Sequence, residues 1–220
     1  MTKKELIFLG PPACGKGTQT EKLAKYLNFP HVDTGSLLRA EIKNETSDGK
    51  IAKSFIDKGN LVPADLVAKI IKNRLSQEDC KKGFILDGYP RSVEQADKLE
   101  IIQDEINNGD EVDFRAIYFD IDTDILVERI VNRRSCPVCG EIYNLEFKPP
   151  KVAGHCDNDG AELTQRKDDT REVAQARFET YFHETAPLID YYKKKGVLKT
   201  IDANGTIEEV WERLLKVVND

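Results

Sequence analysis

The sequence lacks any apolar run long enough to cross a membrane, and its first apolar stretch, Leu6–Leu9, is too short for the hydrophobic region of a signal peptide. It also lacks internal repeats and low-complexity tracts. Its net charge of -6 argues against nucleic acid or an anionic membrane as a partner of the surface as a whole. We therefore expect a cytoplasmic protein with one core domain that can carry insertions.

Cysteine is scarce, with five residues, and no secretory signal accompanies them, so we expect free thiols or a metal site rather than disulfide bonds. Cys136 and Cys139 form one CxxC element, and Cys156 and Asp159 repeat its spacing after a gap of sixteen residues. This pattern predicts a tetrahedral zinc site, which would be structural because four protein ligands leave no open position. The alternatives are His155 as the fourth ligand, or reduced cysteines without metal. Asp159 is favoured because it repeats the spacing of the first pair.

The clearest motif is the glycine-rich stretch Gly10–Thr18, which follows the apolar run Leu6–Leu9 and precedes a segment of helical period. It has the spacing G-x-x-x-x-G-K of a P-loop, with the threonine one position later than usual. Backbone N–H groups of such a loop and of the helix start bind an anion. Lys16 would contact the β- and γ-phosphates, and Thr18 would offer a hydroxyl. The alternative is a chance glycine-rich turn, but strand, lysine and helix together favour a nucleotide phosphate site.

Strand-like and helix-like segments alternate along the rest of the chain, which predicts a parallel sheet of about five strands flanked by helices. A helix over Thr123–Arg134 would place Arg129 and Arg133 on one face, four residues apart. The composition changes from Ser135 to about Asp169, where cysteine, proline and glycine are more frequent and helical periodicity is weak. We expect an inserted subdomain there that is mostly β or irregular.

Several cations at strand ends and helix faces suggest that two phosphate chains are clamped from both sides. They are Lys16, Arg39, Arg91, Arg129, Arg133, Arg166 and Arg177. Asp87 ends an apolar strand and suits a magnesium ion held through water, although it could also be a cap. The Asn-Lys-x-Asp run with which a GTPase recognises guanine does not occur.

These motifs resemble those of the adenylate kinase family in its long-lid form, and the match runs essentially from end to end. The resemblance rests on Gly10–Thr18 with Gln19, Asp33-Thr34-Gly35 with Arg39, Asp87-Gly88-Tyr89-Pro90-Arg91 with Gln95, and Arg166-Lys167-Asp168-Asp169 with Arg177. The Asp-Gly-aromatic-Pro-Arg motif is specific to this family and to closely similar nucleoside monophosphate kinases.

The resemblance implies a P-loop kinase fold and the reversible transfer of a phosphoryl group from magnesium-bound ATP to AMP, giving two ADP. The implied catalytic residues are Lys16, Arg91, Arg133, Arg166 and Arg177. The implied ATP-binding residues are Ala13, Cys14, Gly15, Lys16, Gly17, Thr18, Arg129, Ile142, Tyr143 and Gly205. The implied AMP-binding residues are Thr34, Arg39, Asn60, Leu61, Val62, Gly88, Tyr89, Pro90, Arg91, Gln95, Arg166 and Arg177.

The resemblance also implies a division of the chain. Residues 1–33, 64–131 and 170–220 would form the core, 34–63 a helical AMP-binding segment, and 132–169 a zinc-stabilised lid. We expect a monomer that acts on ATP, AMP and ADP. By resemblance Asp168 and Asp169 would hold the arginines or the closed lid.

The conformation of Ala13, the role of Gln95 and the alternative functions need the structure or further evidence to decide. The family usually has glycine where this chain has Ala13, so a positive φ there would strain the loop. Gln95 either completes a capping box with Ser92 or pairs with the adenine edge. The alternative functions are a kinase for UMP/CMP or GMP and, from another class, a zinc-ribbon protein that binds nucleic acid.

Overall fold

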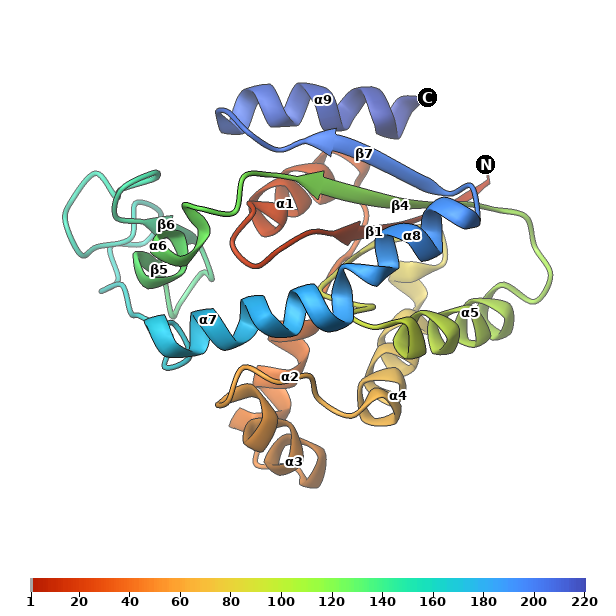
Figure 1. The fold of residues 1–220 in the computed structure, drawn as a ribbon, viewed down its shortest axis with the longest axis horizontal. Coiled ribbons are helices and arrows are strands. Elements are labelled where there is room, and N and C mark those ends of the chain that lie inside the picture. The colour runs from red at the N-terminus through yellow and green to blue at the C-terminus, as the bar shows by residue number, and fades with distance from the viewer. Residues whose placement is uncertain (1) are drawn as a thin grey trace.

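The computed structural model describes residues 2–220, and its centre is a five-stranded, all-parallel sheet (Figure 1). The strands are β1 (Lys3–Leu9), β2 (His31–Asp33), β3 (Gly83–Asp87), β4 (Val112–Asp120) and β7 (Leu198–Asp202), in the order β2-β3-β1-β4-β7. The predicted parallel sheet of about five strands is confirmed.

Helices cover both faces of this sheet, and the alternation of side chains along β1 shows how. Ile7 and Leu9 belong to one buried cluster, together with residues of α4 (Ala64–Leu75), α5 (Val93–Asn107) and α8 (Pro187–Lys194). Leu6 and Phe8 belong to a second cluster, with residues of α1 (Lys16–Leu27), α6 (Leu126–Val131) and α9 (Ile207–Asn219). Consecutive residues of a strand point to opposite faces of the sheet, so the continuous apolar run of β1 contributes side chains to the buried cluster on each face.

Two segments extend from this core at separate places (Figure 1). Helices α2 (Thr34–Lys43) and α3 (Ser47–Ile56) pack on each other beyond the β2 edge. At the other place a two-stranded antiparallel hairpin, β5 (Arg133–Ser135) and β6 (Ile142–Asn144), organises the inserted subdomain. None of the helices within residues 2–220 has the length and apolar character needed to span a membrane.

The helix expected over 123–134 is shorter than predicted. It ends at Val131, and Arg133 is the first residue of β5, paired with Asn144. The expectation that Arg129 and Arg133 share one helical face is therefore wrong, because hydrogen bonding to β6 replaces the last helical turn. Further along the chain, a π-helical turn at Tyr181–Thr185 separates α7 (Arg171–Thr180) from α8.

Candidate active site

The glycine-rich loop connects the end of β1 to the start of α1, as its spacing predicts. Gly15 precedes the helix with a φ of 94°, and no side chain caps the N-terminus. The first turn of α1 contains no acidic residue, so its free N–H groups and partial positive charge face the loop. Lys16 Nζ donates to Gly10 O at 2.6 Å and to Pro11 O at 2.9 Å, which holds the ammonium against the loop. The loop is thus shaped to bind an anion.

Ala13 adopts a φ of 61° within this loop, which is the positive value foreseen as a strain on alanine. A residue with a Cβ in the left-handed region costs about 1–2 kcal/mol relative to the right-handed one. The surrounding loop therefore imposes a conformation that glycine would adopt without this cost.

A cavity of about 1020 Å³ opens in front of the loop, and we call it the phosphate cavity. It brings together most of the residues proposed from the sequence, which come from all three parts of the expected division. Those lining it are Ala13, Cys14, Gly15, Lys16, Gly17, Thr18, Arg39, Leu61, Asp87, Gly88, Pro90, Arg91, Arg129, Arg133, Ile142, Tyr143, Arg166, Arg177 and Gly205.

The arginines of this cavity are close enough to perturb one another. Burial, together with the charges of Arg133 and Arg39, lowers the pKa of Arg166 to about 10. Burial, together with the charges of Arg133 and Arg91, lowers the pKa of Arg177 to about 10. Burial is the larger cause of both shifts, and crowding of positive charge adds to it; a polyanion placed among these guanidinium groups would relieve the crowding.

Two aspartates fix part of this arginine group. The carboxylate of Asp169 has no solvent exposure and accepts two hydrogen bonds from Arg133, one of them from Nε at 2.8 Å. Arg177 Nη1 lies 3.5 Å from Asp168 and 3.7 Å from Asp169. Asp168 and Asp169 therefore hold the arginines, as the resemblance implies.

Asp87 lies at the end of β3, in register with Asp33 at the end of β2. A Cβ on Gly17 would lie 3.8 Å from Asp87 Oδ2, so the carboxylate faces the start of α1 and the phosphate loop. His31 Nε2 lies 3.6 Å from the same oxygen. Burial lowers the pKa of His31, but the nearby carboxylates of Asp87 and Asp33 outweigh it and raise the pKa overall.

Gln95 does not form the reciprocal capping box with Ser92 that was the alternative to recognition of adenine. Ser92 Oγ does accept from Gln95 N at 3.3 Å, but Gln95 Oε1 accepts from the N–H of Arg91 at 2.8 Å. Because a backbone N–H can only donate, this bond assigns Oε1 and leaves Nε2 as a free donor. Gln95 is 3% exposed and lines a second cavity, together with Asn60, Leu61 and Val62.

Two residues expected to bind AMP line neither of these cavities. The side chain of Tyr89 is fully buried in the core. Thr34 is 3% exposed, and its Oγ1 has no partner among residues 2–220.

Other residues of the phosphate cavity were not anticipated from the sequence. Phe147 lies in the insert with its ring 4.7 Å from the guanidinium carbon of Arg129, and both line the cavity. Asp33, which caps α2, contacts Arg39 Nη2 at 3.2 Å. Asp33 belongs to a motif quoted for the resemblance, but it was not assigned to the site. His31 lies on the same short strand, a signal that could have identified it, whereas nothing local distinguishes Phe147.

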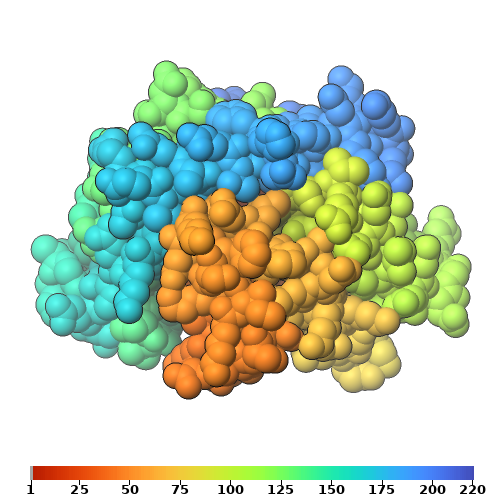
Figure 2. Space-filling view, turned by 60° about the horizontal axis from the view of Figure 1, so that its bottom comes forward, coloured from red at the N-terminus to blue at the C-terminus, as the bar shows by residue number. Residues whose placement is uncertain are grey.

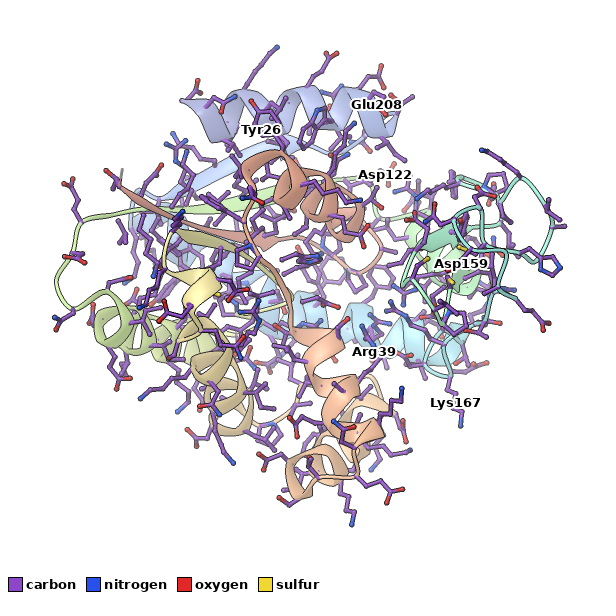
Figure 3. The ribbon with its side chains drawn as sticks, turned by 180° about the vertical axis from the view of Figure 1, so that it is seen from behind. Tyr26, Arg39, Asp122, Asp159, Lys167 and Glu208 are labelled. Atoms are coloured by element: carbon purple, nitrogen blue, oxygen red, sulfur yellow. The ribbon has the colours of Figure 1, made fainter. Side chains whose placement is uncertain are left out.

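The four zinc-ligand candidates converge in the insert, where sulfur atoms gather beside Asp159 (Figure 3). Their ligand atoms all lie within 4.8 Å of one another. Cys139 Sγ and Cys156 Sγ are 3.5 Å apart, near the roughly 3.8 Å expected between two thiolates on a tetrahedral zinc. The rival His155 is outside this cluster and directs Nδ1 to Gly160 O at 3.2 Å.

A P-loop at the carboxyl edge of a parallel sheet, faced by a group of arginines, defines a P-loop enzyme of phosphoryl transfer. The family model described as adenylate kinase matches residues 8–197. Adenylate kinase of Caldanaerobacter subterraneus subsp. tengcongensis is 46% identical over 213 residues, 97% of this chain and 95% of its own. Adenylate kinase of Bacillus subtilis is 45% identical over 206 residues, 94% of each chain. The chain belongs to the adenylate kinase family.

Proposed function

We propose that the adenylate kinase reaction, the reversible transfer of the γ-phosphoryl group of ATP to AMP, takes place in the phosphate cavity. The observation that carries this assignment is that one continuous cavity contains both the P-loop and the arginines of three other parts of the chain. Phosphoryl transfer needs alignment and neutralisation of charge more than covalent chemistry by the protein. One chain supplies all of these groups, so we propose the monomer as the functional unit.

The ATP phosphates would bind to the backbone of Ala13–Thr18 with Lys16 beside the β- and γ-phosphates. Arg129 and Arg133 lie on the insert side of the cavity and would contact the same phosphates, while the backbone at Ile142-Tyr143 and Gly205 borders the nucleoside. The side chain of Tyr143 packs in the insert core, where its hydroxyl accepts from Asp157 N at 2.7 Å. Its contribution to the nucleotide site is therefore through the backbone.

The AMP phosphate would bind to Arg39 and Arg91, and Arg166 and Arg177 would bridge it to the transferring group. Arg91 Nε donates to Gly88 O at 2.9 Å. The Nη donors of the same guanidinium group remain for the phosphate. Closure of segments 34–63 and 132–169 over the two nucleotides would exclude water, which otherwise competes with AMP for the phosphoryl group.

Adenine is the base that the Gln95 amide favours. With Oε1 held by Arg91 N–H, Nε2 presents a donor, and N1 of adenine is an acceptor. N1 of guanine carries a hydrogen and is itself a donor, so it cannot accept a hydrogen bond from Gln95 Nε2. Buried polar groups left without a partner are what makes such discrimination strong. This supports AMP over GMP as the acceptor.

Magnesium and zinc fit two separate groups of residues. Asp87 faces the phosphate loop and offers the hard oxygen that magnesium takes, so it would hold the ion through water next to the phosphates. Magnesium there would neutralise phosphate charge. The Cys136, Cys139, Cys156 and Asp159 donor set suits a closed structural zinc site that ties the two arms of the lid together.

Calorimetry with an inhibitor that joins two adenosines through five phosphates tests the assignment of two nucleotide sites to one cavity. We expect this compound to bind at least 100-fold more tightly than ATP, on the order expected when two linked sites are filled together. Equal affinities would indicate a single nucleotide site and overturn the assignment.

A further inference from the structure

The second cavity, about 1040 Å³ in volume, includes part of the proposed AMP base site, because Asn60, Leu61, Val62 and Gln95 line it, and we call it the outer cavity. Leu61 and Thr180 line both it and the phosphate cavity, so the two are neighbours. Gln95 lines only the outer cavity. On the molecular surface the segment 34–63, the start of α5 and the end of α7 come together at this place (Figure 2).

The lining of the outer cavity is chemically opposite to that of the phosphate cavity. It has apolar walls, which include Phe55, Val62 and Phe182, and three carboxylates at Glu94, Glu179 and Glu184. None of its lining residues within 2–220 is a lysine or arginine. A phosphate would be repelled here, whereas an aliphatic chain that ends in a cation matches both the walls and the charge.

Two of the three carboxylates already lie near a basic side chain. Glu94 lies 3.8 Å from Lys98, and Glu184 lies 2.9 Å from His183 Nδ1. Glu179 forms no ion pair within the described chain, residues 2–220. Glu179 and Glu184 come from the consecutive elements α7 and the π-helical turn, and both line the cavity.

The direction of the Gln95 amide gives the ligand orientation that we infer at this cavity. The Gln95 side chain is only 3% exposed, and its Nε2 donates to no acceptor among residues 2–220. If Nε2 meets N1 of adenine, as the proposed function has it, the neighbouring 6-amino group lies at the same edge of the base. A substituent on that amino group would leave the base site on the side that Gln95 lines.

We propose that the enzyme accepts AMP derivatives that carry an aminoalkyl chain on the 6-amino group of adenine. The chain occupies the outer cavity, and its terminal ammonium pairs with Glu179 and Glu184. This inference rests on the proposed function, since it needs the AMP base beside Gln95. The chemistry is unchanged: the γ-phosphoryl group leaves ATP as the phosphate oxygen of the derivative attacks it, giving ADP and the N6-substituted ADP.

Steady-state kinetics with three acceptors and magnesium-ATP test the proposal. The acceptors are AMP, N6-(6-aminohexyl)-AMP and N6-hexyl-AMP, which differ in the chain and in its terminal charge. We expect kcat/KM for the aminohexyl compound to be within about tenfold of AMP. We also expect it to exceed the hexyl compound by roughly two- to fivefold, the size of an exposed ion pair.

A double variant, Glu179→Gln with Glu184→Gln, should remove the difference between the two derivatives and leave AMP kinetics unchanged. A control of equal charge change, Glu111→Gln with Glu212→Gln, alters two exposed acids that do not line the cavity and should preserve the difference. Turnover of AMP without turnover of either derivative would overturn the proposal, as would an unchanged difference in the Glu179→Gln, Glu184→Gln variant. If AMP itself is not phosphorylated, the proposed function fails as well.

Discussion

Replacement of Ala13 by glycine should stabilise this protein, which is the reverse of the usual effect of glycine. Ala13 has a φ of 61°, and the left-handed conformation costs a residue with a Cβ about 1–2 kcal/mol. Glycine avoids that cost but adds roughly 0.4–1 kcal/mol of chain entropy to the unfolded state. The difference leaves a gain of about 0.8 kcal/mol in the free energy of unfolding. For a chain of this size such a gain raises Tm by about 2–3 °C.

The assay is thermal unfolding of Ala13→Gly beside a matched control, Ala24→Gly. Ala24 lies inside α1, where glycine should cost about 1 kcal/mol and lower Tm by about 2–4 °C. The two substitutions make the same chemical change eleven positions apart in the sequence, one in the loop and one in the helix that follows it. The reasoning would be refuted if both variants lost stability to the same extent, because the backbone at Ala13 would then carry no strain.

The other predictions concern chemistry, the buried ion pair and the metal. Lys16→Met should lower kcat by about 10³- to 10⁵-fold, the range for loss of one essential cation, while circular dichroism shows an intact fold; near-normal turnover would remove Lys16 from the site. Asp169→Ala should destabilise the protein by about 3–5 kcal/mol in urea unfolding, because it leaves Arg133 without its buried partner; a loss below about 1 kcal/mol would show that the pair is not stabilising. Elemental analysis should find one zinc per chain. The zinc should be released on acidification, because the cysteine thiols bind zinc only after they lose their protons. Cys156→Ala should lose the zinc and lower Tm with activity retained at low temperature, whereas Cys80→Ala should keep it; zinc-free native protein would contradict the site.

Much of the site could be predicted from the sequence because its key residues follow strand ends. The carboxyl ends of parallel strands meet at one edge of a sheet, so Gly10–Thr18 after β1 and Asp87 at the end of β3 had to lie close together. The zinc-ligand cluster was predictable for a related reason. Its spacing is local, and two short knuckles need only one hairpin to bring them together.

The features that the sequence did not reveal depend on contacts between distant segments. The end of α6 at Val131 is decided by pairing of Arg133 with Asn144 in the hairpin. The direction of the Gln95 amide is fixed by the backbone N–H of Arg91, and only once the loop is folded. The outer cavity combines residues near 60, 94 and 180, and no local pattern in any one of them indicates it.

The most direct test of the central claim is to follow the phosphoryl group from γ-labelled ATP in the presence of magnesium and each of four acceptors, AMP, GMP, CMP and UMP. We expect the label to appear on the β-phosphate of ADP formed from AMP, with two ADP produced for each ATP and AMP consumed. AMP should be used at least 100-fold more efficiently than GMP, about the discrimination that an opposed buried donor gives. Release of the label as inorganic phosphate, or faster transfer to GMP, CMP or UMP than to AMP, would contradict the account.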